Sequence, residues 1–192
     1  VLSFGPRFAS ADQMKALVPV PQAETWWTER HERAVARIQQ GHADLLFIGD
    51  SITQGREEDG RRVWDNYYGR RRAVQLGSNS DRTATVLWRL QHGELDGITP
   101  KLAVVMIGTN NTSMREDPPE NTAAGIQAIL TTLRTRLPQT KILLLAVFPR
   151  GASADDPLRH VNQAVNDRLR AYADQRQVFF LDLGPRFLDA AG

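Results

Sequence analysis

A serine that could act as a nucleophile follows a short apolar run. Residues 44–48 read Asp-Leu-Leu-Phe-Ile and lead directly into Gly49-Asp50-Ser51. A glycine permits a tight turn, and a serine that opens the next helix presents its hydroxyl where the helix dipole favours developing negative charge. Helix capping by Asp50 and Ser51 is the structural alternative, because both are common N-cap residues. The tripeptide alone is weak evidence for catalysis.

Two other polar segments also follow apolar runs. The run at 104–107 leads into Gly108-Thr109-Asn110-Asn111, and the run that ends at Leu76 leads into Gly77-Ser78-Asn79-Ser80-Asp81. An asparagine side chain, or a backbone N–H fixed in such a loop, can donate a hydrogen bond to an oxyanion. Turns built from asparagine are the plainer explanation of each segment taken singly. Together the three segments predict a site for acyl chemistry.

The elements that would position these loops can be identified from hydrophobic spacing. Short apolar runs, typical of strands buried on both faces, occur at residues 44–48, 73–76, 101–107, 141–148 and 177–181. Helical spacing occurs at residues 26–40, 83–91, 119–136 and 157–173. This alternation predicts an α/β three-layer sandwich, with a flavodoxin-like five-stranded parallel sheet and helices on both faces. Ligands of such a sheet bind beyond the carboxyl ends of its strands.

Composition limits the classes of function. The 192 residues, 41% of them hydrophobic, suffice for one domain, which we place at residues 22–192 after an N-terminal arm at residues 1–21. A net charge of +2 gives little support to nucleic-acid binding, and no apolar run approaches the length of a membrane span.

The absence of cysteine excludes disulfides and thiolate nucleophiles. Because the chain begins at Val1 instead of Met, loss of a leader favours a secreted or periplasmic protein. Homo-oligomerisation is left open.

With these blocks the sequence resembles the GDSL or SGNH hydrolases, whose Ser, Gly, Asn and His come from separate segments. Residues 86–90, 93–95, 149–151 and 157–159 extend the resemblance to the catalytic subunits of platelet-activating-factor acetylhydrolase and their bacterial relatives. The resemblance covers roughly residues 44–188. It implies a serine ester hydrolase that needs no cofactor or metal and removes short acyl groups, acetyl above all, through an acyl-enzyme. The alcohol would be phospholipid-like or a carbohydrate.

The resemblance also implies a role for each block. Ser51 would be the nucleophile, its own N–H and the side chain of Asn110 would donate to the oxyanion, and Ser80 stands where the family has the glycine that completes the oxyanion hole. A serine keeps the N–H but lacks the freedom of glycine at positive φ. We therefore expect a loop of different shape or a narrower pocket at Ser80.

The histidine that should activate the serine is not evident. The four histidines are His31, His42, His92 and His160, and none lies in the Asp-x-x-His pattern of the family. His160 has Asp156 four residues before it, but we expect it to be a surface histidine. Because Ala190-Ala191-Gly192 resembles the turn before the family's last block, we expect the natural protein to continue past Gly192 with that block.

Two alternatives stay open. A non-catalytic module that keeps the crevice without a base could recognise acylated lipid or carbohydrate. A flavodoxin-like nucleotide or phosphate binder ranks last, because no glycine-rich phosphate loop is present.

The aromatic residues near the blocks, namely Trp64, Tyr67, Tyr68 and Trp88, could line a pocket, but we expect Trp88 to pack in its helix. Of the adjacent Trp26 and Trp27, only one can face the core.

Overall fold

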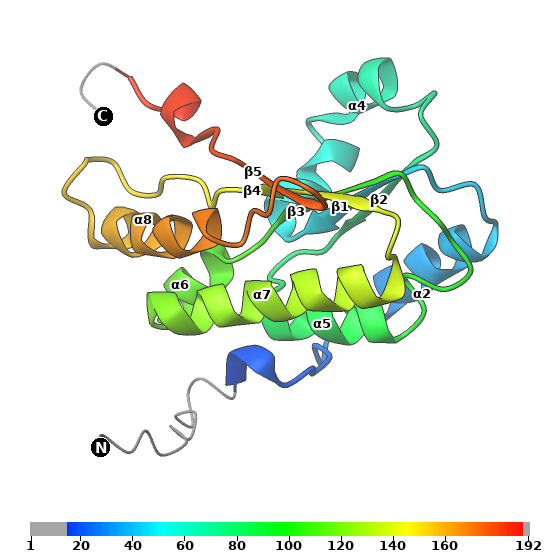
Figure 1. Ribbon diagram of the computed structural model, residues 1–192, viewed down its shortest axis with the longest axis horizontal. Coiled ribbons are helices and arrows are strands. Elements are labelled where there is room, and N and C mark those ends of the chain that lie inside the picture. Colours follow the sequence, from blue (N-terminus) through cyan, green and yellow to red (C-terminus); the bar gives the residue numbers. More distant parts are fainter. Residues whose placement is uncertain (1–14, 190–192) are drawn as a thin grey trace.

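The computed structural model describes residues 15–189, so most of the predicted arm and the predicted turn at 190–192 lie outside the described residues. One parallel sheet organises this part of the chain, and its strand order is β2-β1-β3-β4-β5 (Figure 1). The strands are β1 (Leu45–Gly49), β2 (Ala73–Gly77), β3 (Leu102–Met106), β4 (Lys141–Leu145) and β5 (Val178–Leu181). This order, with all strands parallel, confirms the predicted flavodoxin-like sheet.

The neighbours of β1 bring the three polar segments together. Gly49, the last residue of β1, is in register with Gly77 at the end of β2 and with Met106 near the end of β3. The strand order reverses at β1, so the loops after β1 and β3 flank a topological switch point, where open α/β sheets bind ligands. The loops after β1, β2 and β3 therefore share one rim.

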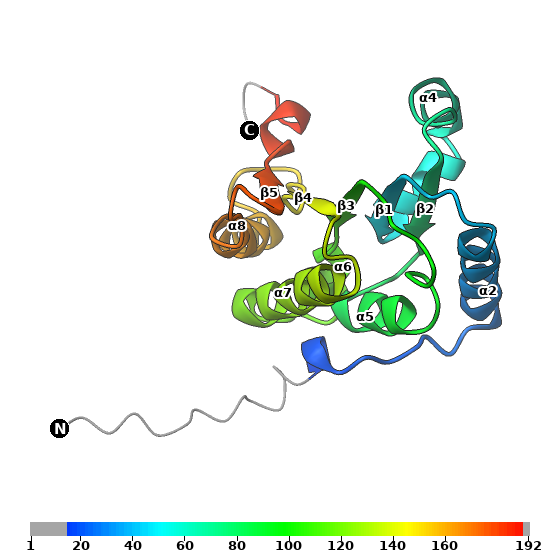
Figure 2. The same cartoon turned by 45° about the vertical axis from the view of Figure 1, so that its right-hand side comes forward.

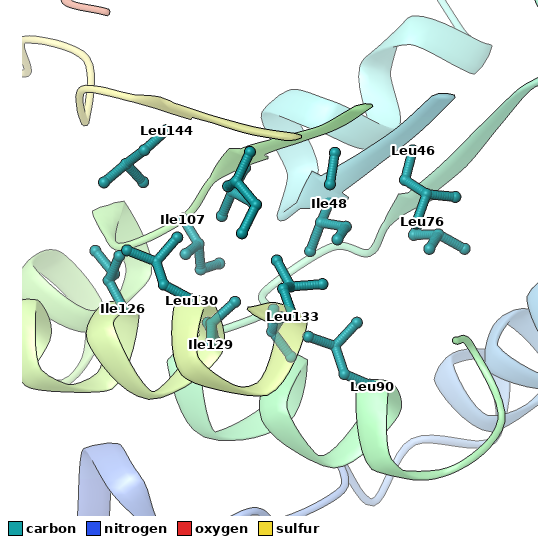
Figure 3. Close-up of a cluster of buried hydrophobic side chains, with 14 of the residues drawn as sticks. Leu46, Ile48, Leu76, Leu90, Ile107, Ile126, Ile129, Leu130, Leu133 and Leu144 are labelled. Atoms are coloured by element: carbon teal, nitrogen blue, oxygen red, sulfur yellow. The ribbon is translucent and has the colours of Figure 1, made fainter. Parts of the chain in front are cut away.

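Four long helices cover one face of the sheet (Figure 2). They are α2 (Thr25–Gln39), α5 (Thr83–Gln91), α7 (Pro119–Arg136) and α8 (Pro157–Arg170). Alternate strand residues such as Leu46, Ile48 and Leu144 point into the layer between the sheet and the helices, where Ile126 and Leu130 of α7 also lie (Figure 3). Each fully buried aliphatic side chain of this kind contributes roughly 1.5–3 kcal/mol, so the apolar layer against these helices is the main source of stability.

The opposite face carries shorter elements. They are α3 (Ser51–Gln54), η1 (Gly55–Glu57), α4 (Arg61–Tyr67) and η2 (Gly184–Phe187), and Figure 2 shows α4 beyond the sheet from the long helices. Trp64 and Tyr68 pack on Phe47 of β1, with ring centroids 5.1 and 4.9 Å away. Helices thus lie on both faces of the sheet, as predicted. Among residues 15–189, one face carries the four long helices and the other carries the short ones.

Trp88 of α5 and the adjacent Trp26 and Trp27 of α2 lie on the long helices. Trp88 contacts Trp27, with ring centroids 5.5 Å apart, and stacks on His92 at 3.9 Å. Trp27 is 1% exposed and Trp26 is 42% exposed, which confirms that only one of the pair faces the core. Trp88 is therefore a packing residue, as expected.

The described part of the arm lies across α5 and α7. Ala16 is fully buried, and its carbonyl accepts a hydrogen bond from Thr83 Oγ1 at 3.0 Å. The N–H of Val20 donates to the carbonyl of Ala84 at 3.3 Å. From Lys15 onward, the chain is thus attached to the outer surface of the helical layer before it enters α2. Between Lys15 and Asp189, no helix is long and apolar enough to cross a membrane.

Candidate active site

Ser51 lies where the sequence places a nucleophile, at the first residue of α3 and exposed to solvent. The turn that leads into Ser51 requires a glycine at position 49, because a Cβ there would lie 2.2 Å from Thr53 Oγ1 and 2.4 Å from the Met106 carbonyl oxygen. Asp50 caps α3 by accepting the Ile52 N–H at 3.0 Å. Asp50 is therefore the cap, and within residues 15–189 the hydroxyl of Ser51 has no hydrogen-bond partner.

The carboxyl group next to the serine is buried. The pKa of Asp50 is raised to about 6, chiefly because the carboxyl is buried; the nearby carboxylate of Asp81 adds to the rise, while the Ile52 N–H and Arg150 limit it. Arg150 follows β4, and its Nη1 donates to Thr109 Oγ1 at 3.1 Å on the rim. The rim thus holds a weakly acidic carboxyl and an exposed cation beside the candidate nucleophile.

Ser80 adopts the backbone conformation that glycine favours. Its φ is +60°, in the left-handed region that side chains rarely occupy. We expected a loop of different shape or a narrower pocket; the serine keeps a positive φ, and its side chain adds to the wall of a depression of about 490 Å³. The other lining residues are Pro21, Gln22, Ala23, Glu24, Trp26, Arg82 and Met114. Among residues 15–189, no group accepts a hydrogen bond from the Ser80 N–H.

The structure distinguishes the two adjacent asparagines that begin α6 (Thr109–Met114). The carboxamide of Asn111 is fully occupied, because its Oδ1 accepts the Thr83 N–H and its Nδ2 donates to Thr83 Oγ1 and Asp117 Oδ2. Asn110 Nδ2 donates one bond, to the Asp81 carbonyl oxygen at 2.9 Å. Its second N–H is available for a ligand. Asn110 therefore fits the predicted oxyanion donor, whereas Asn111 ties α5 to the loop after α6.

Direct contacts join the three loops. A Cβ on Gly77 would lie 2.7 Å from the Gln54 backbone nitrogen and 2.9 Å from the Asp50 carbonyl oxygen, so the end of β2 packs against the Ser51 turn. The bond from Asn110 to Asp81 connects the third loop to the second. The structure therefore brings Ser51, Ser80 and Asn110 to one end of three adjacent strands.

No histidine completes the site among residues 15–189, where none donates to or accepts from Ser51. His160 is exposed in the first turn of α8, and the carboxylate of Asp156 accepts the Leu158 N–H at 2.8 Å as an N-cap. That carboxylate therefore does not orient His160 as a base. The other histidines are His31, bonded to Glu94, His42 before β1, and His92, stacked on Trp88.

Sequence reasoning missed a buried charged cluster behind the second loop. Arg89 pairs with Asp81 Oδ2 at 2.7 Å and with Glu94, and all three side chains are at most 2% exposed. Burial alone would raise the pKa of Glu94, but Arg89 and His31 outweigh it and hold the pKa below its usual range. The available signal was an arginine within the apolar stretch at residues 86–90 and a glutamate five residues after it.

A metal centre would need several acidic, histidine or cysteine side chains close together. In the part of the chain that the structure describes, no three such side chains come together as ligands.

Comparisons with known proteins agree with this arrangement. Residues 47–192 match the GDSL-like Lipase/Acylhydrolase family. The chain is 37% identical over 172 residues to platelet-activating factor acetylhydrolase IB subunit alpha2 of Rattus norvegicus, covering 89% of this chain and 72% of the relative. It is 35% identical over 188 residues to subunit alpha1 of Bos taurus, covering 95% and 78%.

Solved structures share the fold. Axe2, an acetylxylan esterase from Geobacillus stearothermophilus, matches with a TM-score of 0.59 and 20% identity, covering 74% of this chain and 77% of that one. Est24, a carbohydrate acetylesterase from Sinorhizobium meliloti, matches with a TM-score of 0.57 and 20% identity, covering 74% and 85%. The family match over most of the chain and the relatives above 30% identity are decisive: this chain belongs to the GDSL-like lipase/acylhydrolase family.

Proposed function

We propose that the protein hydrolyses carboxylic esters through an acyl-enzyme at Ser51. The observation that carries the proposal is the convergence of three loops at the carboxyl ends of β1, β2 and β3. Ser51, exposed and with no side-chain partner among residues 15–189, lies in the first loop, and Ser80 and Asn110 lie in the other two. The Ser51 oxygen attacks the ester carbonyl, the alcohol leaves with a proton, and water then releases the acid from the serine. Family membership supports this class of reaction.

The oxyanion of the tetrahedral intermediate would be held by three donors. The Ser51 N–H lies in the first turn of α3, where helical N–H groups have no intrahelical acceptor. The Ser80 N–H and the second N–H of Asn110 Nδ2 are the others. Because these groups are fixed before substrate binds, they can stabilise developing charge without reorganising, and each donor of this type is worth about 10²–10³ in turnover.

The acyl group is proposed to be short, with acetyl preferred. The proposal rests on relatives whose names describe acetyl transfer to water: the platelet-activating factor acetylhydrolase subunits at 35–37% identity and, by fold, the acetylxylan and carbohydrate acetylesterases. The alcohol is proposed to be a carbohydrate or a phospholipid-like molecule. Ser80 lines a depression of about 490 Å³, which Ser51 and Asn110 do not line, and we propose that part of the alcohol extends from Ser51 into this depression.

A binding module without catalysis is the second candidate. A serine hydroxyl needs a base, normally a histidine oriented by a carboxylate. Within residues 15–189 no histidine contacts Ser51, and this observation favours the alternative. The base is therefore the part of the proposed machinery that the described contacts do not identify.

A series of esters that differ only in acyl length separates the two candidates. The protein with its natural termini would be given acetyl, butyryl and hexanoyl esters of one alcohol, with Ser51→Ala as the control. We expect kcat/KM to be highest for acetyl and to fall by roughly tenfold or more by hexanoyl, since a short pocket rejects the added methylenes. Saturable binding of an acetylated ligand without turnover would establish the binding module instead.

A further inference from the structure

The half-buried Gln22, in the segment before α2, bonds to the loop that carries Ser80. Its Nε2 donates to the Asn79 carbonyl oxygen at 3.0 Å and to Asp81 Oδ1 at 2.8 Å. These residues lie 57 and 59 positions away in the sequence. A single carboxamide thus reaches from the segment before α2 to both sides of Ser80.

The bond to Asn79 fixes the direction of the Ser80 N–H. The carbonyl of Asn79 and the N–H of Ser80 belong to one planar peptide unit, and in a trans peptide they point in opposite directions. No cis peptide is present in the described chain. A donor that holds the Asn79 oxygen therefore turns the Ser80 N–H to the opposite side of the unit and also polarises it.

The other contacts of the loop complete this arrangement. The Asn79 N–H donates to Gln54 Oε1 at 2.9 Å, which ties the loop to α3. The carboxylate of Asp81 accepts Trp27 Nε1 at 2.8 Å and Arg89 Nε at 2.9 Å, and its carbonyl accepts Asn110 Nδ2. Asp81 thus connects the loop of Ser80 to the carboxamide of Asn110.

Ser80 needs such support because its backbone is strained. A non-glycine residue at a φ of +60° costs of order 1–3 kcal/mol and persists only where its surroundings hold it. Gln22, Gln54 and the buried Asp81 are the groups that hold it.

We propose that Gln22 is a positioning residue of the oxyanion hole. Through the Asn79–Ser80 peptide it directs the Ser80 N–H, and through Asp81 it helps to fix the carbonyl that orients Asn110. The inference rests on the proposed ester hydrolysis. Gln22 acts through neighbouring groups and takes no part in bond making.

Three variants of the protein with natural termini test this role. Gln22→Met removes both hydrogen bonds at similar side-chain length, and Gln22→Lys restores a donor to the same two oxygens. Gln177→Met is the matched control: Gln177 is also half-buried, and its Nε2 donates to the Pro138 and Thr140 carbonyls, both at 3.1 Å, at the opposite end of the sheet.

For acetyl ester hydrolysis we expect kcat of Gln22→Met to fall about tenfold or more with KM within about twofold, because the lost support acts on the transition state. Gln22→Lys should recover most of the kcat. Gln177→Met should keep the kcat of the natural protein, and the two methionine variants should have comparable Tm values. An unchanged kcat in Gln22→Met, or no recovery with lysine, would overturn the proposal.

A protein that hydrolyses no ester would refute the proposed function, and the positioning claim would then be decided by NMR. The amide ¹⁵N resonance of Ser80 is sensitive to a hydrogen bond on the preceding carbonyl. We expect it to move in Gln22→Met and to stay in place in Gln177→Met. A resonance unaffected by Gln22→Met would contradict the positioning role.

Discussion

Ser80 shows how one backbone angle can be kept when the residue type changes. The family resemblance places a glycine at this position, and the serine here retains a φ of +60°. Its N–H has no acceptor among residues 15–189, and Ser80 is one of the residues that line the adjacent depression. At this position the strain lies in the backbone of the site itself.

Replacing Ser80 with glycine should therefore stabilise the protein. We expect Ser80→Gly to raise the free energy of unfolding by up to about 1 kcal/mol, since relief of the left-handed strain exceeds the greater entropy of the unfolded chain. Ser153→Gly, at an exposed loop serine outside the positive-φ residues, should lower it by about 0.5 kcal/mol. Urea unfolding measures both values. Equal losses in the two variants would show that Ser80 is unstrained.

Asp50 should make stability depend on pH. Burial raises its pKa from 3.8 to about 6, so the unfolded chain loses this proton at lower pH than the native protein does. The carboxyl therefore lowers the free energy of unfolding as pH rises from about 4 to about 7, and once the native carboxyl is ionised the total loss is about 3 kcal/mol.

The variant Asp50→Asn can still accept the Ile52 N–H but has no charge to bury. We expect its free energy of unfolding, relative to the natural protein, to increase by about 3 kcal/mol between pH 4 and pH 8. The exposed Asp155, replaced by asparagine, is the control and should show little change. A constant difference across this range would mean that Asp50 titrates as an exposed carboxyl.

Residue types revealed part of the site before its geometry was known. Ser51 and Asn110 could be predicted because each follows a buried strand at a glycine, and Ser80 came from the family resemblance. Gln22 could not be predicted, because its role depends on two hydrogen bonds to residues 57 and 59 positions away. Arg89 lies in an apolar helix segment, and sequence alone does not show that buried carboxylates surround it.

At the scale of elements, the strongly apolar segments were the predictable ones. All five strands and the four long helices occur, and the bounds of α5 and α7 match the predicted residues 83–91 and 119–136. The strand predicted at residues 141–148 ends at Leu145, because the backbone N–H and carbonyl of Val147 bond to the carboxamide of Asn166 on α8 instead of to a neighbouring strand. The helix predicted at residues 157–173 ends at Arg170.

The short helices α4 and α6 escaped prediction for a physical reason. In α4 no residue is buried, and α6 reads Thr-Asn-Asn-Thr-Ser-Met, so neither has an apolar period. Their stability comes from tertiary contacts: Trp64 of α4 packs on Phe47, and Asn111 of α6 bonds to Thr83 and Asp117. Helix propensity and hydrophobic periodicity are local properties of the sequence and do not reveal such contacts.

The packing of β2 against α3 should be intolerant of any side chain at Gly77. Its Cβ would lie 2.7 Å from the Gln54 backbone nitrogen, so the nucleophile turn must move. We expect Gly77→Ala to lower the free energy of unfolding by about 2–3 kcal/mol and to reduce kcat on acetyl esters.

Gly55 provides the matched control for this change. It has right-handed helical φ and ψ, and a Cβ added there would meet nothing within 4 Å, so Gly55→Ala should raise stability by about 0.5 kcal/mol and leave kcat unchanged. Both values follow from thermal unfolding and steady-state kinetics. Similar stabilities of the two variants would show that the β2 and α3 backbones are not in close contact.

At the scale of the molecule, the site is assembled from segments far apart in the chain. The sheet brings three strand ends to one rim, α2 supplies Trp27 against Asp81, and the segment before α2 supplies Gln22. The long helices of Figure 2 cover one face of the same sheet. The segment before α2 therefore contacts a loop of the candidate site, a contact that spacing in the sequence does not predict.

The proposal that Ser51 is the nucleophile is tested most directly with a fluorophosphonate probe and intact-mass spectrometry. With the natural-termini protein we expect one adduct, located on Ser51 by peptide mapping, and none in Ser51→Ala. Asn110→Ala should react about 10²–10³-fold more slowly because one oxyanion donor is lost, whereas Asn111→Gln, if folded, should stay far closer to the natural rate. Labelling of a different residue, or no labelling at all alongside undiminished ester hydrolysis by Ser51→Ala, would contradict it.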